Sequence, residues 1–142
     1  MDKEIRREII LDNYQNPVNR GLKEDDSYIL KNTNNDSCID NIDMMMKIEN
    51  DIVVDAVFDG EACAICTSAT SIMIKTLIGK TVKEAEEIIK NYQNMINEEE
   101  YDKDVLKELL VFDDTSKQPS RIKCATLSAN GIKDYLEEEN HS

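Results

Sequence analysis

The sequence lacks any long apolar run and is poor in basic side chains. No apolar stretch approaches the about 18 residues of a membrane-spanning helix, which argues against a segment of that kind. Lysine and arginine number 17 against 30 acidic residues, so the net charge is -13. Because such a surface repels nucleic-acid phosphates and anionic lipid, we expect no nucleic acid and no membrane as partner. A basic protein or a metal cation matches this charge better.

Histidine and tryptophan are almost missing from the chain. Tryptophan is absent, and the single histidine, His141, is expected to be solvent-exposed rather than a metal ligand. Residues 1–11 alternate charge with isoleucine and lack both the apolar block of a signal peptide and the acid-poor pattern of a transit peptide. These features predict a cytoplasmic protein, whose four cysteines stay reduced and serve as metal ligands or reactive thiols rather than disulfides.

The pattern of apolar residues predicts a single domain over residues 1–142 with an α+β fold. Helices are expected over residues 2–13, 67–78, 81–97 and 102–110, and after Pro119. A short edge strand at 28–30 and a hairpin over 42–49 and 52–58 form a small antiparallel sheet, covered by helices on one side. Gly60 is expected to end the last strand, and residues 137–142 are expected to be a disordered tail.

Three cysteines fall at junctions between the predicted elements. Cys38 precedes the hairpin, Cys63 lies between strand and helix, and Cys124 lies in the first turn of the last helix. Loop ends of this kind can meet at one edge of a sheet, and Asp40 could add an oxygen ligand there. Three cysteines and one aspartate suit tetrahedral zinc or the edge of an iron-sulfur cluster. The alternative, which spacing alone leaves open, is that these cysteines are small buried hydrophobic residues.

Cys63-Ala-Ile-Cys66 also forms a C-x-x-C motif at the start of a predicted helix, as in thiol-disulfide oxidoreductases. The preceding strands form a hairpin rather than a βαβ unit and no tryptophan flanks the motif, so this function is the weaker alternative. We expect Cys66 to pack as a thiol in the first helical turn. A zinc hydrolase or deaminase is weaker still, because four protein ligands leave no open position and no His-x-Glu pair is present.

Four short motifs stand in order along the chain. They are Tyr14-Gln-Asn-Pro17-Val-Asn19-Arg-Gly21, Cys38-Ile-Asp40, Gly60-Glu-Ala-Cys63-Ala-Ile and Arg121-Ile-Lys-Cys124-Ala-Thr-Leu127. In this order they resemble the motifs of the IscU/SufU/NifU N-terminal family of iron-sulfur cluster assembly proteins. The resemblance covers residues 5–135 and implies the α+β fold of that family.

Within the family the sequence is most similar to the SufU branch. Residues 96–118 resemble the extra stretch of SufU, Lys123 stands where IscU-type scaffolds carry histidine, and the Leu-Pro-Pro-Val-Lys segment of IscU is missing. The resemblance implies a zinc-bound acceptor of persulfide sulfur from a SufS-like cysteine desulfurase, which then serves downstream iron-sulfur assembly proteins. The alternative that it implies is a scaffold that holds a [2Fe-2S] cluster or iron on the same residues.

The resemblance also assigns roles to individual residues. Cys38, Asp40, Cys63 and Cys124 would hold the metal or cluster, and Cys38 would be the catalytic sulfur acceptor once a desulfurase histidine takes over a zinc position. Tyr14 would contribute to a desulfurase-binding surface.

Three further positions depart from the family pattern or have weaker assignments. Ile39 replaces the usual glycine and disfavours a positive φ between Cys38 and Asp40, and Cys66 replaces the usual serine. Arg121 would hydrogen-bond a thiolate or persulfide, or be an ordinary surface arginine.

Overall fold

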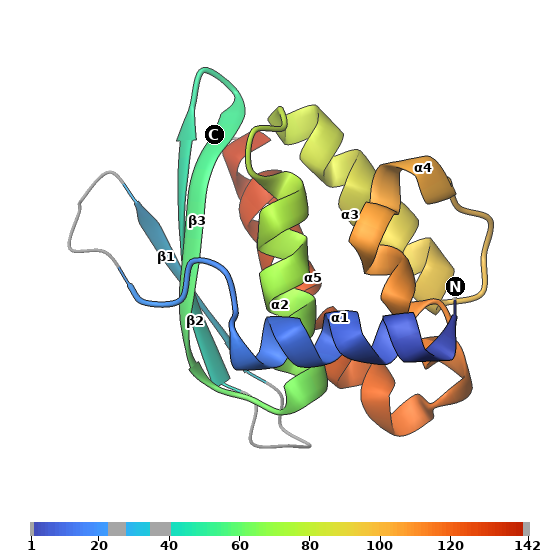
Figure 1. Ribbon diagram of the computed structural model, residues 1–142. Coiled ribbons are helices and arrows are strands. Elements are labelled where there is room, and N and C mark those ends of the chain that lie inside the picture. The colour runs from blue at the N-terminus through green and yellow to red at the C-terminus, as the bar shows by residue number, and fades with distance from the viewer. Residues whose placement is uncertain (1, 23–27, 35–40, 141–142) are drawn as a thin grey trace.

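The computed structural model describes residues 2–22, 28–34 and 41–140 (Figure 1). The predicted site residues Cys38 and Asp40, together with Ile39, lie outside these ranges, and so does His141. Within them, a sheet forms one layer and helices cover one of its faces, which confirms the α+β prediction (Figure 1).

The sheet has three antiparallel strands in the order β1-β2-β3. They are β1 (Ile29–Asn34), β2 (Asn41–Glu49) and β3 (Ile52–Glu61). Asn50 and Asp51 join β2 to β3 with φ of 53° and 63°, the left-handed backbone that tight hairpin turns require. Ile42, Met44 and Met46 alternate along β2 and are buried, which confirms the hairpin and its period of two.

The prediction that Gly60 ends the last strand is wrong. Gly60 lies inside β3, with φ of +135°. A Cβ atom at this position would stand 2.2 Å from the carbonyl oxygen of Asn41 on the neighbouring strand. The missing side chain therefore lets the first residue of β2 approach β3 closely, and the pairing continues to Asn41 and Glu61.

The helices begin at local capping signals. Asp2 caps α1 (Lys3–Gln15) through a hydrogen bond from the Glu4 N–H. Thr81 and Glu84 form a reciprocal capping box at α3 (Val82–Ile96), and the hydrogen bond from the Thr81 N–H lowers the pKa of the Glu84 carboxyl. Both helices were predicted within two residues at either end.

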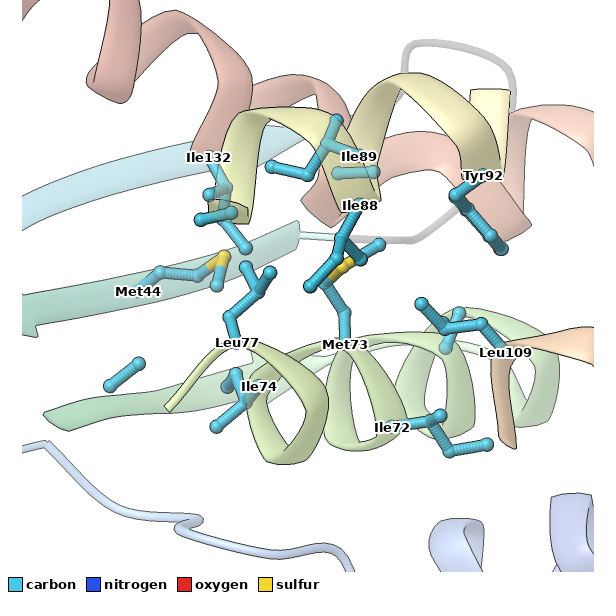
Figure 2. Packing of buried hydrophobic residues seen from close by; sticks show 14 of the residues in the cluster. Met44, Ile72, Met73, Ile74, Leu77, Ile88, Ile89, Tyr92, Leu109 and Ile132 are labelled. Atoms are coloured by element: carbon cyan, nitrogen blue, oxygen red, sulfur yellow. The ribbon is translucent and has the colours of Figure 1, made fainter. Parts of the chain in front are cut away.

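The central helix α2 (Ala64–Leu77) begins three residues before its predicted start. Of its 14 residues, 11 are buried, so it forms the middle of the core. Figure 2 shows Met73 and Leu77 of this helix pointing toward Ile88 of α3 and Met44 of β2, with Ile132 above them. Ser71, one of its buried polar residues, donates to Asn13 Oδ1 over 2.8 Å and so links α2 to α1.

The region between α3 and the last helix contains short turns instead of one helix over 102–110. It comprises α4 (Lys103–Leu106) and two 3₁₀ segments, η1 (Lys107–Phe112) and η2 (Thr115–Lys117). Lys107 has φ of 50°, which stops the α-helix after one turn. The tighter winding of η1 buries the consecutive residues Val111 and Phe112.

The last helix, α5 (Pro119–Asn140), is longer than predicted at both ends. It begins at Pro119, so Cys124 lies in its second turn and not in its first. It also includes residues 137–140, which were expected to be disordered; the buried residues Tyr135 and Leu136 hold this end against the core. Among the described residues, no helix is both long and apolar enough to span a membrane.

Candidate functional site

Cys63 occupies the junction between β3 and α2. It is the N-cap of α2 in an extended backbone conformation, and its Sγ accepts a hydrogen bond from the Cys66 N–H at 3.4 Å. The side chain is only partly buried. A cysteine in place of the usual serine or aspartate cap leaves a sulfur at the helix start, where it is within reach of solvent.

The end of β3 pairs closely with the start of β2 because Gly60 has no side chain. Asn41 pairs with Glu61, two residues before Cys63, and Asn41 directly follows Asp40 in the chain. The close approach of the Asn41 carbonyl to Gly60 therefore helps to fix the position of the strand end that leads to Cys63. Gly60 belongs to the cysteine motif in the sequence, but this role could not be predicted from the motif because the contact is made across the sheet.

The first of the four sequence motifs, residues 14–21, forms hydrogen bonds with the outer edge of β3. The Asn19 amide donates to the Ala56 carbonyl at 3.0 Å, and the Gly21 N–H donates to the Phe58 carbonyl at 2.8 Å. Arg20 donates to the Gly60 carbonyl at 3.1 Å. These residues were quoted in the motif without an assigned role, and the structure shows that they hold the strand leading to Cys63.

Cys124 is partly buried in the second turn of α5. Helices α2 and α5 pack against each other, and both begin on the same side of the core (Figure 1). Cys63 and Cys124 thus lie near the N-terminal ends of two neighbouring helices.

The donor set within the described residues is compatible with a soft metal ion but incomplete. Cys63 and Cys124 offer two sulfur atoms, the ligand type that zinc and iron-sulfur clusters prefer. Over residues 2–22, 28–34 and 41–140, no three histidine, cysteine, aspartate or glutamate side chains come together as a metal site. The two further ligands that the sequence predicts, Cys38 and Asp40, lie outside those ranges.

Cys66 is fully buried in the hydrophobic core, one turn after the helix cap. This confirms the prediction that it packs as a thiol in the first turn of the helix. Its carbonyl accepts a hydrogen bond from Thr70 Oγ1 at 2.8 Å.

Replacing Cys66 with alanine is expected to lower the free energy of unfolding by about 1 kcal/mol, because the substitution removes one buried sulfur atom and leaves a small cavity. The metal content of the purified protein should not change, since the side chain lies in the core. Urea denaturation and elemental analysis of the variant check the two parts. Loss of metal from Cys66→Ala, at a level equal to that from Cys63→Ala, would identify Cys66 as a ligand instead.

Two of the three accessory residues predicted from the sequence, Tyr14 and Arg121, line one groove. Arg121 is exposed in the first turn of α5, and Tyr14 is 43% exposed near the end of α1. Both line a groove of about 370 Å³, together with Ala64 and Ile65 from the start of α2. Lys123 is exposed and does not line this groove.

The chain is similar to known proteins over nearly its whole length. Residues 5–140 match the family described as the NifU-like N terminal domain. The zinc-dependent sulfurtransferase SufU of Bacillus subtilis (strain 168) is 37% identical over 136 residues, which cover 95% of this chain and 91% of that protein. The iron-sulfur cluster assembly scaffold protein IscU of Thermotoga maritima is 33% identical over 134 residues, which cover 94% of each chain.

Solved structures show the same fold. The crystal structure of FiSufU from Fervidobacterium islandicum AW-1 superimposes with a TM-score of 0.88 at 32% identity, covering 95% of this chain and 99% of that one. The N-terminal part of a NifU-like protein from Brucella abortus reaches a TM-score of 0.80 at 20% identity, with 92% of both chains covered, and so supports the fold alone.

Proposed function

This chain belongs to the NifU-like N terminal domain family, as its four motifs predicted, and we propose that it is a zinc-dependent sulfur acceptor in iron-sulfur cluster assembly. The similarity to a zinc-dependent sulfurtransferase over 95% of the chain supports this role. The partner would be a SufS-like cysteine desulfurase, and downstream assembly proteins would receive the sulfur, all in the cytoplasm.

The observation that carries the proposal is the placement of Cys63. It lies at the cap of α2, and the strand before it is held in register with the first described residue of β2. In the sequence, Asp40 precedes that residue by one peptide bond and Cys38 precedes it by three. Cys38, Asp40, Cys63 and Cys124 would hold the zinc, which when bound keeps its cysteine ligands as thiolates.

The sulfur-transfer step needs no external oxidant. The Cys38 thiolate attacks the terminal sulfur of a persulfide on the desulfurase, and a new S–S bond forms on Cys38. The S–S bond of the donor persulfide breaks at the same time, and the desulfurase cysteine leaves as a thiolate. Cys38 would be exposed to this attack once a desulfurase side chain takes its place as a metal ligand.

A second candidate function is a scaffold for a [2Fe-2S] cluster. It is favoured by the 33% identity to an IscU scaffold protein over 94% of the chain. The same three cysteines and Asp40 would serve as ligands, because thiolates bind both zinc and iron-sulfur clusters. The two functions therefore differ in the species that occupies the site.

Metal analysis of the untagged protein, with an ultraviolet-visible spectrum, distinguishes the two functions. For the sulfur acceptor we expect about one zinc per chain and no visible absorption, with zinc lost in Asp40→Ala and Cys63→Ala and retained in Cys66→Ala. A brown protein that contains iron and sulfide in equal amounts would establish the scaffold function instead.

Substitution of Cys38 tests the assignment of the acceptor. Cys38→Ala should abolish the stimulation of a cognate cysteine desulfurase while circular dichroism shows a retained fold. Cys66→Ala serves as the matched control, because it removes a thiol from the core and leaves the predicted ligands unchanged. Full stimulation by Cys38→Ala would reject the assignment.

A further inference from the structure

A groove runs along α1, opposite the 3₁₀ segments, and its lining differs in charge from the rest of the chain. We call it the α1 groove; it has a volume of about 370 Å³ and is lined by α1, η1, η2 and the first turns of α2 and α5. Figure 1 shows α1 crossing in front of α2, with its N-terminal half beside the segment that precedes α5.

The bottom and one edge of the α1 groove are apolar. Val111 and Phe112 are buried and form part of its lining, and Ile65 joins them from the first turn of α2. On the α1 side, Leu11 is 47% exposed and Tyr14 is 43% exposed. These two side chains add exposed apolar surface next to the apolar lining, as in pockets that bind apolar groups.

Cations surround this apolar strip. Lys3, Arg7 and Arg121 line the α1 groove, and none of them forms an ion pair with a residue in the described part of the chain. The chain as a whole has a net charge of -13, so a groove lined by three such cations is a positively charged region on a negatively charged protein. The field of these side chains attracts acidic groups to a surface that is otherwise acidic.

The two other charged side chains of the α1 groove, Arg6 and Asp114, form an ion pair with each other. Arg6 donates to Asp113 at 2.6 Å and to Asp114 at 3.1 Å, and this fork joins α1 to the end of η1. Asp114 is the one acidic side chain of the lining, and Arg6 holds it. Because Arg6 is shared by Asp113 and Asp114, one negative charge remains beside the three positive charges of Lys3, Arg7 and Arg121, and the net charge at the groove is positive.

The length of the α1 groove defines the size of its occupant. Lys3 and Tyr14 mark its two ends on α1, a distance of about 16 Å at a rise of about 1.5 Å per residue. An extended peptide of about five residues covers this distance, at about 3.3 Å per residue.

We propose that the α1 groove binds a short segment of an acidic partner protein, in which aspartate or glutamate side chains flank one or two large apolar side chains. The apolar side chains occupy the strip beside Leu11 and Tyr14, and the carboxylates pair with Arg7 and Arg121. A second copy of this chain fits less well, because two copies of charge -13 repel each other. Since Ala64 and Ile65 line the same groove, a docked segment brings its protein next to Cys63.

The experiment uses defined peptides and single charge reversals. Fluorescein-labelled peptides of about nine residues, with leucine and phenylalanine at varied central positions among glutamates, are titrated with the full-length protein at about 50 mM salt. We expect saturable binding, at least about tenfold tighter than that of the same peptides with lysine in place of glutamate. Arg7→Glu and Leu11→Glu should each weaken binding at least about tenfold.

Lys83→Glu is the matched control, because it makes the same change of charge on α3, outside the α1 groove. It should bind the peptides as the wild type does. Zinc content is measured on Arg7→Glu as well, so that a failure of peptide binding is distinguished from a failure of the metal site.

Three outcomes would overturn the proposal. One is that no acidic peptide binds saturably, and another is that Arg7→Glu binds as tightly as Lys83→Glu does. The third is that the wild type prefers phosphatidylserine vesicles, or sediments as a dimer that Leu11→Glu dissociates, because a lipid surface or a second copy would then be the occupant.

Discussion

Replacing Gly60 with alanine is expected to lower the free energy of unfolding by about 3 to 5 kcal/mol, through backbone strain and overpacking together. The new Cβ would stand 2.2 Å from the Asn41 carbonyl oxygen and 3.1 Å from the Ile42 Cα, both of which are backbone atoms. Because backbone cannot turn away as a flexible side chain does, β2 and β3 must separate at this end. The φ of +135° adds strain, since only glycine adopts it readily.

Gly21→Ala is the control for Gly60→Ala. Gly21 has φ of +114°, but nothing lies within 4 Å of an added Cβ, so its substitution costs only the backbone strain. We expect a loss of about 1 to 2 kcal/mol, which urea denaturation of both variants measures. Equal losses in the two variants would show that the approach of Asn41 to Gly60 contributes nothing. Under the proposed function, Gly60→Ala should also retain less zinc than Gly21→Ala does.

Replacing Tyr92 with alanine is expected to lower the free energy of unfolding by about 4 kcal/mol. The ring is fully buried (Figure 2), and it meets Phe112 edge to face with the ring centroids 6.2 Å apart. Its hydroxyl donates to the Ala125 carbonyl at 2.7 Å, so this one side chain joins α3 to α5 and η1. Since Ala125 follows Cys124, the same variant is expected to loosen the turn of α5 that carries that cysteine.

Tyr92→Phe tests the hydroxyl separately through the pH dependence of stability. Burial raises the pKa of the Tyr92 phenol well above its ordinary value, and the nearby Cys66 adds to the shift. In the unfolded chain the phenol ionises near pH 10, so above about pH 10 the unfolded state loses a proton that the folded state keeps. The contribution of Tyr92 to the free energy of unfolding is therefore fully present below about pH 10. Above about pH 10 it falls by about 1.4 kcal/mol for each further pH unit.

The phenylalanine variant lacks this contribution. It should be about 1 kcal/mol less stable than the wild type at pH 8, and the difference should shrink and then change sign above about pH 10. Urea denaturation of both proteins between pH 8 and about 11 measures this difference in the free energy of unfolding. The other ionisable groups are the same in both proteins, so their contributions cancel. A difference that stays constant with pH would contradict the burial of this hydroxyl.

Local signals in the sequence were sufficient for the elements whose determinants are close together in the chain. The capping box of Thr81 and Glu84 lies within four residues, and it marks the start of α3 correctly. The alternation of Ile42, Met44 and Met46 is likewise local, and it predicted both the strand and its buried face. The motifs around Cys38, Cys63 and Cys124 identified the family, and each of them is a run of a few neighbouring residues.

Features that depend on contacts between distant residues required the tertiary structure. Gly60 is a strand residue because Asn41 approaches it across the sheet, and the sequence around Gly60 carries no sign of that approach. Residues 107–110 were predicted as the end of a helix over 102–110 but belong to a 3₁₀ segment that continues to Phe112, and this segment buries Val111 and Phe112 in the core. The end of α5 is ordered to Asn140 because Tyr135 and Leu136 pack against other elements.

The sequence by itself determined the fold class, the family and the candidate ligands of this protein, since hydrophobic period, helix caps and motif order are all properties of short segments. Only the tertiary structure decided that Cys63 caps α2 and that Arg121 and Tyr14 share a groove with Lys3 and Arg7. The physical reason is that a groove or a close approach is made by side chains from several elements. Their distances depend on how the core packs, and not on the propensities of any one segment.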